Sequence, residues 1–454
     1  MKDPRDTPPH ETPRATPDAS AAPTALKKAL TTPLLYFFIL GDVLGAGVYV
    51  LVGQVAADSG GAVWVPLVVA LCLALLTAAS YAELVTKYPR AGGASHYTTL
   101  AYGPFAGFVA GFCMLAAGIV SVAALARGFA GDYLTEFVTL PVVLVVIVFL
   151  AALALLNARG IRESTRANAV ATVVEVSGLL IVIGLGLWIV LRGDGDLGRL
   201  TELGTESHGP AAAVLSGAVL AYYSFVGFET SVNVAEETRD PRRSYPRALF
   251  GALVTAGAVY ALVGAAAAAA VPTATLAGSS GPLLEVVREA GGVPTELFSA
   301  IALVAVANGA LLTGIMSSRL AYGMARDGLL PGFLTKVLPG RRTPWASIAA
   351  TTALSLLLAL TGDVATLAST LVLLLLVVFF LVNTSALVLR RDNASRPAAR
   401  DHFRAPTVVP LLGAASCVAL ATQIEREVWV RGLIVLAVGV VCGAIAAARL
   451  RRRG

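Results

Sequence analysis

Long apolar stretches follow one another along this chain, and short polar segments separate them. A helix needs about 20 consecutive apolar residues to cross the ~30 Å hydrocarbon core of a bilayer. Twelve stretches approach or reach this length: 34–57, 62–86, 104–127, 138–157, 168–191, 211–235, 248–271, 296–318, 345–361, 364–389, 407–422 and 429–449. We therefore expect an all-α polytopic membrane protein with twelve transmembrane helices, of which the ninth and eleventh spans are the weakest.

The composition agrees with this pattern and excludes a water-soluble protein. Of the 454 residues, 57% are hydrophobic and 14% are charged, whereas soluble domains carry about 25% charged residues. Residues 1–24 are rich in proline and polar residues and contain no apolar run, which predicts a disordered cytoplasmic tail and no cleaved signal peptide. The four cysteines and four histidines are scattered, so neither a metal site nor a cofactor is expected.

Lysine and arginine are concentrated in the two tails and in alternate loops. Cytoplasmic loops of membrane proteins carry an excess of these residues. With the N-terminus inside, six of the 34 basic residues fall in outer loops or outer helix ends: Arg127, Arg192, Arg199, Arg288, Arg426 and Arg431. We therefore expect a multi-pass protein of the plasma membrane with both termini in the cytoplasm. Charges divided among loops form no single basic face, so no nucleic-acid partner is expected.

Two of the apolar spans are interrupted in their middle, five spans apart. The first interruption covers residues 40–49 and the second covers residues 222–229, and each contains glycine and one acid. Paired interruptions in corresponding positions of two halves point to a transporter binding site at the membrane midplane. Gly41 and Gly45 also have the four-residue spacing of a close helix–helix contact, which is the alternative interpretation. The pairing favours two interrupted helices in an inverted repeat of five spans each.

This interpretation divides the chain into two repeats with flanking segments. The expected segments are a disordered tail (1–30), a first repeat with spans one to five (31–192), an outer loop (193–210), a second repeat with spans six to ten (211–389), an inner loop (390–406), spans eleven and twelve (407–449) and a basic cytoplasmic tail (450–454).

An interrupted helix offers two complementary sets of backbone groups. The half-helix after the break begins with free N–H groups and the positive end of its dipole, which suit a carboxylate. The half-helix before the break ends in free carbonyl groups, which suit an ammonium group or a cation. An α-amino acid carries both charges on neighbouring atoms, so one broken helix can satisfy both of them.

The residues around the first break resemble the first-span motif of the cationic amino acid transporters, a branch of the amino acid–polyamine–organocation permease superfamily. This motif reads Leu44-Gly45-Ala46-Gly47-Val48-Tyr49-Val50-Leu51. Three further stretches agree in the same order, namely 88–97 after span two, 223–241 across span six and 318–331 after span eight. Animal members of the cationic branch have two more C-terminal spans than this chain.

The resemblance implies a role for each residue of the two interruptions. Gly45, Ala46, Gly47 and Val48 would form the unwound segment whose amides hold the substrate carboxylate. Tyr223 would cover the substrate on the outer side, with Phe225 as the second candidate and ordinary aromatic packing as the alternative. Ser224 lies between these two residues, and Gly227 would be the break in span six.

Acids inside a span are costly and point to function. The resemblance links Glu229 to proton coupling or to recognition of a basic substrate, while a neutral acid that bonds freed backbone groups is the alternative. Glu175 stands where proton-coupled relatives often have lysine, so it titrates in place of lysine, pairs with another residue or coordinates a cation. Asp42 bonds the carbonyl end of the first broken helix or favours a cationic substrate. For Glu83, at the cytoplasmic end of span two, we expect a salt bridge to an inner-loop arginine.

These observations favour a secondary active transporter of amino acids or related amines that works by alternating access. Proton-coupled symport is the first expectation, with sodium the less favoured ion, and an exchanger or a non-transporting nutrient sensor is the alternative. A membrane-embedded enzyme would need clustered His, Asp or Cys residues near one interface, which this chain lacks. No GxxxxGK[ST] pattern for ATP binding occurs. The acids would tolerate a cationic side chain, or, if neutral, would leave a pocket for small or aliphatic amino acids.

Overall fold

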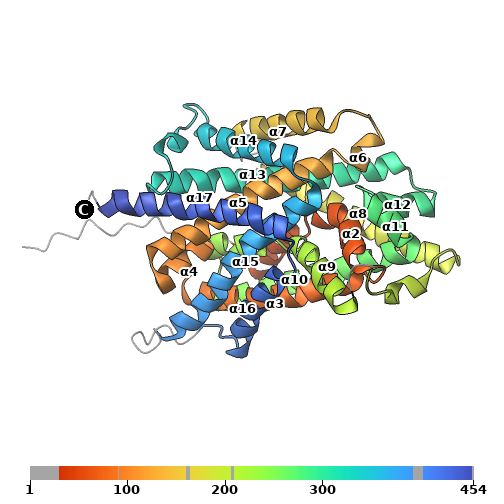
Figure 1. The fold of residues 1–454 in the computed structure, drawn as a ribbon, viewed down its shortest axis with the longest axis horizontal. Helices are drawn as coiled ribbons and strands as arrows, with labels where there is room; N and C mark the ends of the chain where they lie inside the picture. The colour runs from red at the N-terminus through yellow and green to blue at the C-terminus, as the bar shows by residue number, and fades with distance from the viewer. Residues whose placement is uncertain (1–29, 90–91, 160–163, 206–208, 392–401, 452–454) are drawn as a thin grey trace, which may run out of the picture.

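The computed structural model describes residues 30–89, 92–159, 164–205, 209–391 and 402–451 (Figure 1). Within these ranges every regular element is a helix, apart from one isolated β-bridge between Leu30 and Thr238. The predicted N-terminal tail lies outside the described residues except for Leu30. Residues 392–401 of the predicted inner loop and residues 452–454 of the basic tail also lie outside them.

Each predicted span corresponds to one helix or to one pair of consecutive helices. In chain order these are α1 (Thr32–Val43) with α2 (Gly47–Ser59), α3 (Trp64–Lys87), α5 (Pro104–Phe129), α7 (Val142–Arg159), α8 (Ser164–Leu191), α9 (Pro210–Tyr223) with the 3₁₀ segment η2 (Phe228–Glu237), α10 (Pro241–Ala270), α13 (Thr295–Arg326), α14 (Trp345–Thr361), α15 (Val364–Leu389), α16 (Val408–Ala421) and α17 (Arg426–Arg451).

Length and composition support most of these helices as membrane spans. In the described part of the chain, nine helices are long and apolar enough to cross a membrane, or ten when the bent pair α1–α2 is taken as one span. The two remaining apolar helices, α14 and α16, are shorter, and they are the two spans that the sequence marked as weakest. The protein is thus a multi-pass helical membrane protein, and twelve crossings stay a prediction.

Short helices that the hydropathy pattern did not predict occupy the two ends of the molecule. They are α4 (Gly93–Tyr102), α6 (Asp132–Thr135), η1 (Leu197–Thr201), α11 (Thr273–Gly278), α12 (Pro282–Ala290) and η3 (Gly332–Thr335). Figure 1 places α11 and α12 at one end and α4 with the C-terminus at the other. The end that holds α4 is the one that the positive charges predict to be cytoplasmic, and we call it the predicted cytoplasmic end.

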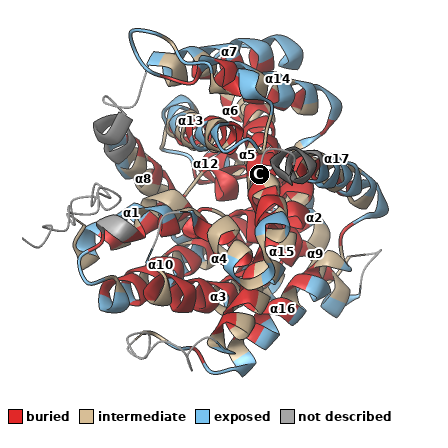
Figure 2. Ribbon diagram, turned by 90° about the vertical axis from the view of Figure 1, so that its left-hand side faces the viewer, coloured by how far each residue is buried: buried red, intermediate tan, exposed pale blue. Residues whose placement is uncertain are grey.

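The core lies among helices that are distant in sequence. In Figure 2 buried residues cover most of α3, α5 and α10, whereas α7, α14 and α17 expose much of their surface. Their exposed side chains include Leu155, Leu357 and Val441. An apolar outer surface of this kind suits hydrocarbon, because lipid tails are as apolar as leucine.

The helix pairs in contact repeat with an offset of five spans. Helix α1 of span one packs on α10 of span seven, and α9 of span six packs on α3 of span two. In the same way α5 packs on α15, and α13 packs on α8. Helices α3 and α10, and likewise α5 and α13, pack directly on their counterparts. When spans one to five are exchanged with spans six to ten, each of these helix contacts becomes another contact that is observed.

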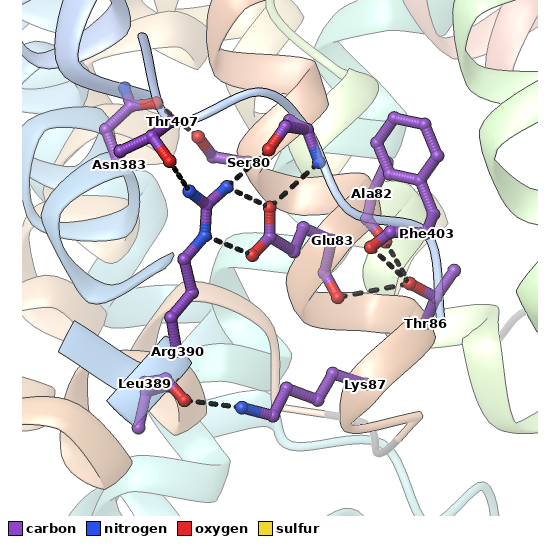
Figure 3. Close-up of polar contacts among 11 residues, drawn as sticks. Ser80, Ala82, Glu83, Thr86, Lys87, Asn383, Leu389, Arg390, Phe403 and Thr407 are labelled. Atoms are coloured by element: carbon purple, nitrogen blue, oxygen red, sulfur yellow. Dashed lines mark hydrogen bonds and ion pairs between the residues drawn. The ribbon is translucent and has the colours of Figure 1, made fainter. Parts of the chain in front are cut away.

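A buried ion pair fastens three elements together at the predicted cytoplasmic end (Figure 3). Arg390, directly after α15, donates two hydrogen bonds to the carboxylate of Glu83 on α3, at 2.6 and 2.7 Å. It also donates to Ala405 O and to Thr407 Oγ1, in the segment that leads into α16. The salt bridge expected for Glu83 is confirmed, and its partner begins the predicted inner loop.

Candidate substrate cavity between the two interrupted segments

The first interruption lies between α1, which ends at Val43, and α2, which begins at Gly47 at an angle of 49°. The amide of Gly45 donates to the carbonyl of Val43 at 2.6 Å. The unwound segment covers residues 44–46, so the prediction of Gly45 to Val48 is correct for Gly45 and Ala46 and wrong for Gly47 and Val48. Gly47 and Val48 are already helical, yet a helix leaves its first amides without intrahelical partners. These amides can meet a ligand without unwinding.

The second interruption separates an α-helix from a 3₁₀ segment. Helix α9 ends at Tyr223, and η2 begins after Gly227, whose φ of +129° favours glycine. The hydroxyl oxygen of Thr230 lies 2.8 Å from Gly227 O, and the hydroxyl of Ser231 donates to Phe228 O at 2.5 Å. Side-chain hydroxyls that bond nearby carbonyls compete with regular α-helix formation, which fits the 3₁₀ geometry.

The two interruptions touch each other at glycines. A Cβ atom placed on Gly47 would lie 2.9 Å from Ser224 Cα, and one on Gly227 would lie 2.7 Å from Asp42 O. Both distances are shorter than real Cβ contacts, so larger residues would push the segments apart. The hydroxyl of Thr230 donates its hydrogen to the carboxylate of Asp42. The residues of the two sequence motifs thus form one site.

A cavity of about 470 Å³ lies against this crossing point. Nine of the eleven candidate residues line it: Asp42, Gly45, Ala46, Gly47, Glu175, Tyr223, Ser224, Gly227 and Glu229. The other two, Val48 and Phe225, are fully buried outside the lining. The ring of Phe225 packs edge-on against Tyr260, with the centroids 5.4 Å apart. The side chain of Phe225 therefore packs in the protein core and does not reach the cavity wall.

Tyr223 joins the interrupted segment to the opposite wall of the cavity. Its hydroxyl lies 3.1 Å from Ser121 Oγ on α5, and both residues are buried. Tyr223 is the last residue of α9, so its position follows directly from the end of that helix. The tyrosine side chain bridges α9 and α5 across the cavity.

The three acids of the cavity have different surroundings. Asp42 is half-buried and accepts the hydrogen bond from Thr230. Glu229 is 4% exposed, and its Oε2 accepts from the amide of Gly227 at 2.9 Å. Glu175 is 1% exposed, and its Oε1 has no hydrogen-bond partner among the described residues. Buried polar atoms are nearly always hydrogen-bonded, so the carboxyl group of Glu175 stands out.

Tyrosine hydroxyls hold the backbone around the first break in place. Tyr260 on α10 donates to Val43 O at 2.6 Å, where α1 ends. Tyr49 on α2 donates to the backbone carbonyl of Glu175 at 2.5 Å, and Tyr133 donates to Tyr49 O at 2.8 Å. The bond from Tyr260 satisfies a carbonyl at the end of α1, and the bonds from Tyr49 and Tyr133 tie α2 to α8 and to α6.

Other lining residues escaped the sequence analysis. They are contributed mainly by α5, α13 and α15 and include Met114, Ser121, Thr313, Met316, Arg319, Leu371 and Leu375. By charge alone, Arg319 belongs with the basic residues of the predicted cytoplasmic side. Its position in the motif 318–331 could have indicated that it lies at the site. The apolar lining residues could not be recognised from the sequence, because apolar side chains are compatible with a lipid-facing surface, with the protein core and with a cavity wall. Among the described residues, no group of three or more His, Cys, Asp or Glu is placed to hold a metal ion.

Comparison with known proteins places the chain in a family of permeases. Residues 30–444 match the amino acid permease family. An uncharacterized transporter of Mycobacterium tuberculosis is 32% identical over 405 residues, covering 88% of this chain and 87% of that protein. The branched-chain amino acid permease BcaP of Bacillus subtilis is 26% identical, covering 93% and 94%. The vacuolar cationic amino acid transporter 4 of Arabidopsis thaliana is 32% identical, covering 81% of this chain and 64% of that protein.

These matches extend over both interrupted segments and point to a transporter, not an enzyme. The likeness to permeases and to cationic amino acid transporters confirms the superfamily that the first-span motif indicated. The chain belongs to the amino acid permease family, within the amino acid–polyamine–organocation superfamily.

Proposed function

We propose that this protein is a secondary active transporter that takes up amino acids across the plasma membrane together with protons. The observation that carries the proposal is the cavity itself, which is lined by both interrupted segments and by three acids. In this proposal the amides at the start of α2 hold the substrate carboxylate, and the carbonyl end of α1 faces its ammonium group. Tyr223 covers the bound substrate on the predicted outer side.

Alternating access is supported by the arrangement of the helices. The helix contacts that repeat with an offset of five spans are those expected of an inverted repeat. Two halves of this kind can rock against each other around a site between them. We therefore propose that α1, α2, α9 and η2 change their positions relative to α5 and α13 during transport.

Glu175 is our first choice for the proton carrier. Thr172, one turn earlier on α8, packs against Gly41 near the end of α1, since a Cβ on Gly41 would lie 3.2 Å from Thr172 Cγ2. The end of a helix carries the negative end of its dipole. An ionised carboxylate there would lack a donor, whereas a protonated carboxyl group can donate to a free carbonyl. Glu229 is the second choice, because its Oε2 already accepts an amide hydrogen bond.

Uptake into proteoliposomes tests the proposal. We expect an inwardly directed proton gradient, with the outside more acidic, to drive accumulation of the amino acid. A sodium gradient at equal pH should drive none. The Glu175→Gln variant should lose accumulation but keep counterflow, because its cavity shape is unchanged. Glu427→Gln, at an exposed position of α17, is the matched control and should behave like the wild type.

Each alternative gives a different result in this assay. An exchanger would take up amino acid only into preloaded vesicles, whichever gradient is imposed. A nutrient sensor would show neither accumulation nor counterflow. Drive by sodium alone would refute proton coupling, and an unchanged pH dependence in both Glu175→Gln and Glu229→Gln would refute the assignment of the coupling acids.

A further inference from the structure

The charged and apolar residues of the cavity are segregated by helix. All three acids lie on the broken segments or beside them: Asp42 is the second-last residue of α1, Glu229 is the second residue of η2, and Glu175 lies on α8 one turn after Thr172, which packs against α1. The amides offered to the substrate carboxylate start at the same break. This side of the cavity can therefore serve the carboxylate and ammonium groups that all α-amino acids share.

The opposite wall, built by α5, α13 and α15, is mainly apolar. Its large side chains are Met114 and Leu125 from α5, Leu312 and Met316 from α13, and Leu371 and Leu375 from α15. Among the lining residues from these three helices none is acidic. Burial of apolar surface is favourable by about 25 cal/mol of free energy per Å² removed from water. This wall therefore favours a substrate with an aliphatic side chain.

Two of the three hydroxyl groups that line this wall, those of Ser121 and Ser317, have protein partners. Ser121 lies in hydrogen-bond distance of the Tyr223 hydroxyl, and Ser317 donates to Thr313 O at 2.8 Å. Such groups do not call for a polar side chain on the substrate. Methionine is flexible and polarizable, so Met114 and Met316 can fit both branched and unbranched side chains.

The one charge that this wall contributes to the described lining is positive. Arg319 follows Met316 by one turn on α13 and lies toward the predicted cytoplasmic end of the cavity. A substrate with a lysine-like side chain would place its second ammonium group on the same wall as this guanidinium group. Arg319 is exposed, so water and salt screen its repulsion. The lining from these helices nevertheless offers no carboxylate as a partner, and an ammonium group without a partner is costly to bury.

We infer that the preferred substrate is an amino acid with a neutral aliphatic side chain, which binds against α5, α13 and α15. This inference rests on the proposed function and specifies the substrate class of the same site. The wall offers no acid to pair with a cationic side chain, and the three acids serve the α-ammonium group and coupling.

Ligand-induced stabilisation of the purified protein tests the inference, because a ligand that binds the folded state raises the unfolding temperature. Leucine, methionine, alanine, lysine and arginine are compared at equal concentration in detergent. Leucine and methionine should give the largest shifts, alanine a smaller one, and lysine and arginine the smallest. A larger shift with lysine than with leucine would overturn the inference while leaving amino acid transport intact. If no amino acid stabilises the protein or is taken up, the proposed function fails as well.

Variants of the wall identify the residues that select the substrate. Leu375→Ala and Leu371→Ala should each weaken leucine binding by about 10-fold or more, as expected for lost methylene contacts, and should leave alanine binding nearly unchanged. Leu357→Ala, which removes an exposed leucine of α14, is the control. Equal losses for leucine and alanine in both wall variants would refute the assignment.

Discussion

The hydroxyl of Thr230 donates a hydrogen bond to the carboxylate of Asp42 and so joins the two interrupted segments at the cavity wall. Asp42 is the second-last residue of α1, and Thr230 lies in the first turn of η2. The two residues come from opposite halves of the chain, and each lies next to a break. This side-chain contact thus joins the two segments next to both breaks.

Removing this contact should weaken both stability and transport. Thr230→Val keeps the shape of the side chain but leaves a carboxylate oxygen of Asp42 without its donor, at a cost of about 1–3 kcal/mol. We expect a lower unfolding temperature in detergent and slower uptake. Thr230→Ser retains the hydroxyl group and should stay close to the wild type. A Thr230→Val protein with unchanged uptake would show that the contact is not needed for transport.

Gly227 should tolerate no side chain. Alanine at this position would adopt a φ near +129° and bring its Cβ to 2.7 Å from Asp42 O, so both backbone strain and a clash oppose it. We expect Gly227→Ala to abolish uptake and to lower the yield of folded protein. Gly184→Ala is the control, because Gly184 lies within α8 with no atom within 4 Å of its added Cβ. Normal uptake by Gly227→Ala would contradict the close approach of the two segments.

The ion pair of Glu83 and Arg390 should be essential for stability. Its side chains are 2% and 9% exposed, and removing one partner of a buried pair costs about 3–5 kcal/mol because a buried charge remains. We expect Glu83→Gln to lower the unfolding temperature clearly. Arg431→Gln breaks an exposed pair with Glu427 on α17, with side chains 35% and 69% exposed. Such pairs contribute about 0–1 kcal/mol, so equal effects of the two substitutions would contradict this account.

The loop regions opposite the predicted cytoplasmic end should lose stability in acid. A hydrogen bond from Thr295 and the nearby Arg288 guanidinium group hold the pKa of Glu136 below its ordinary value of 4.5. A lowered pKa in the folded state stabilises the protein above pH 4.5, and this contribution disappears as the pH falls through the folded-state pKa. We therefore expect Glu136→Gln to unfold at a lower temperature than the wild type at pH 7. The difference should vanish in strong acid, and a difference that grows on acidification would have the wrong sign.

Much of the fold follows from hydropathy and from two short motifs. The apolar runs located every long helix, and the run 364–389 coincides with α15 at both ends. The candidate residues of the two interruptions, together with Glu175, include nine residues of the cavity lining. The short helices α4, α11 and α12 escaped this treatment because they are too short or too polar to resemble spans.

The sequence by itself determined the membrane class, the order of the helices and the place of the two breaks, because these depend on local composition and on residues that interrupt a helix. Only the tertiary structure decided which faces of the helices meet at the cavity. It placed Arg319 and the apolar wall opposite the acids, paired Glu83 with Arg390, and moved Phe225 out of the site. An apolar helix has no strong amphipathic pattern to reveal its inner face, so close packing between segments far apart in the chain makes that choice.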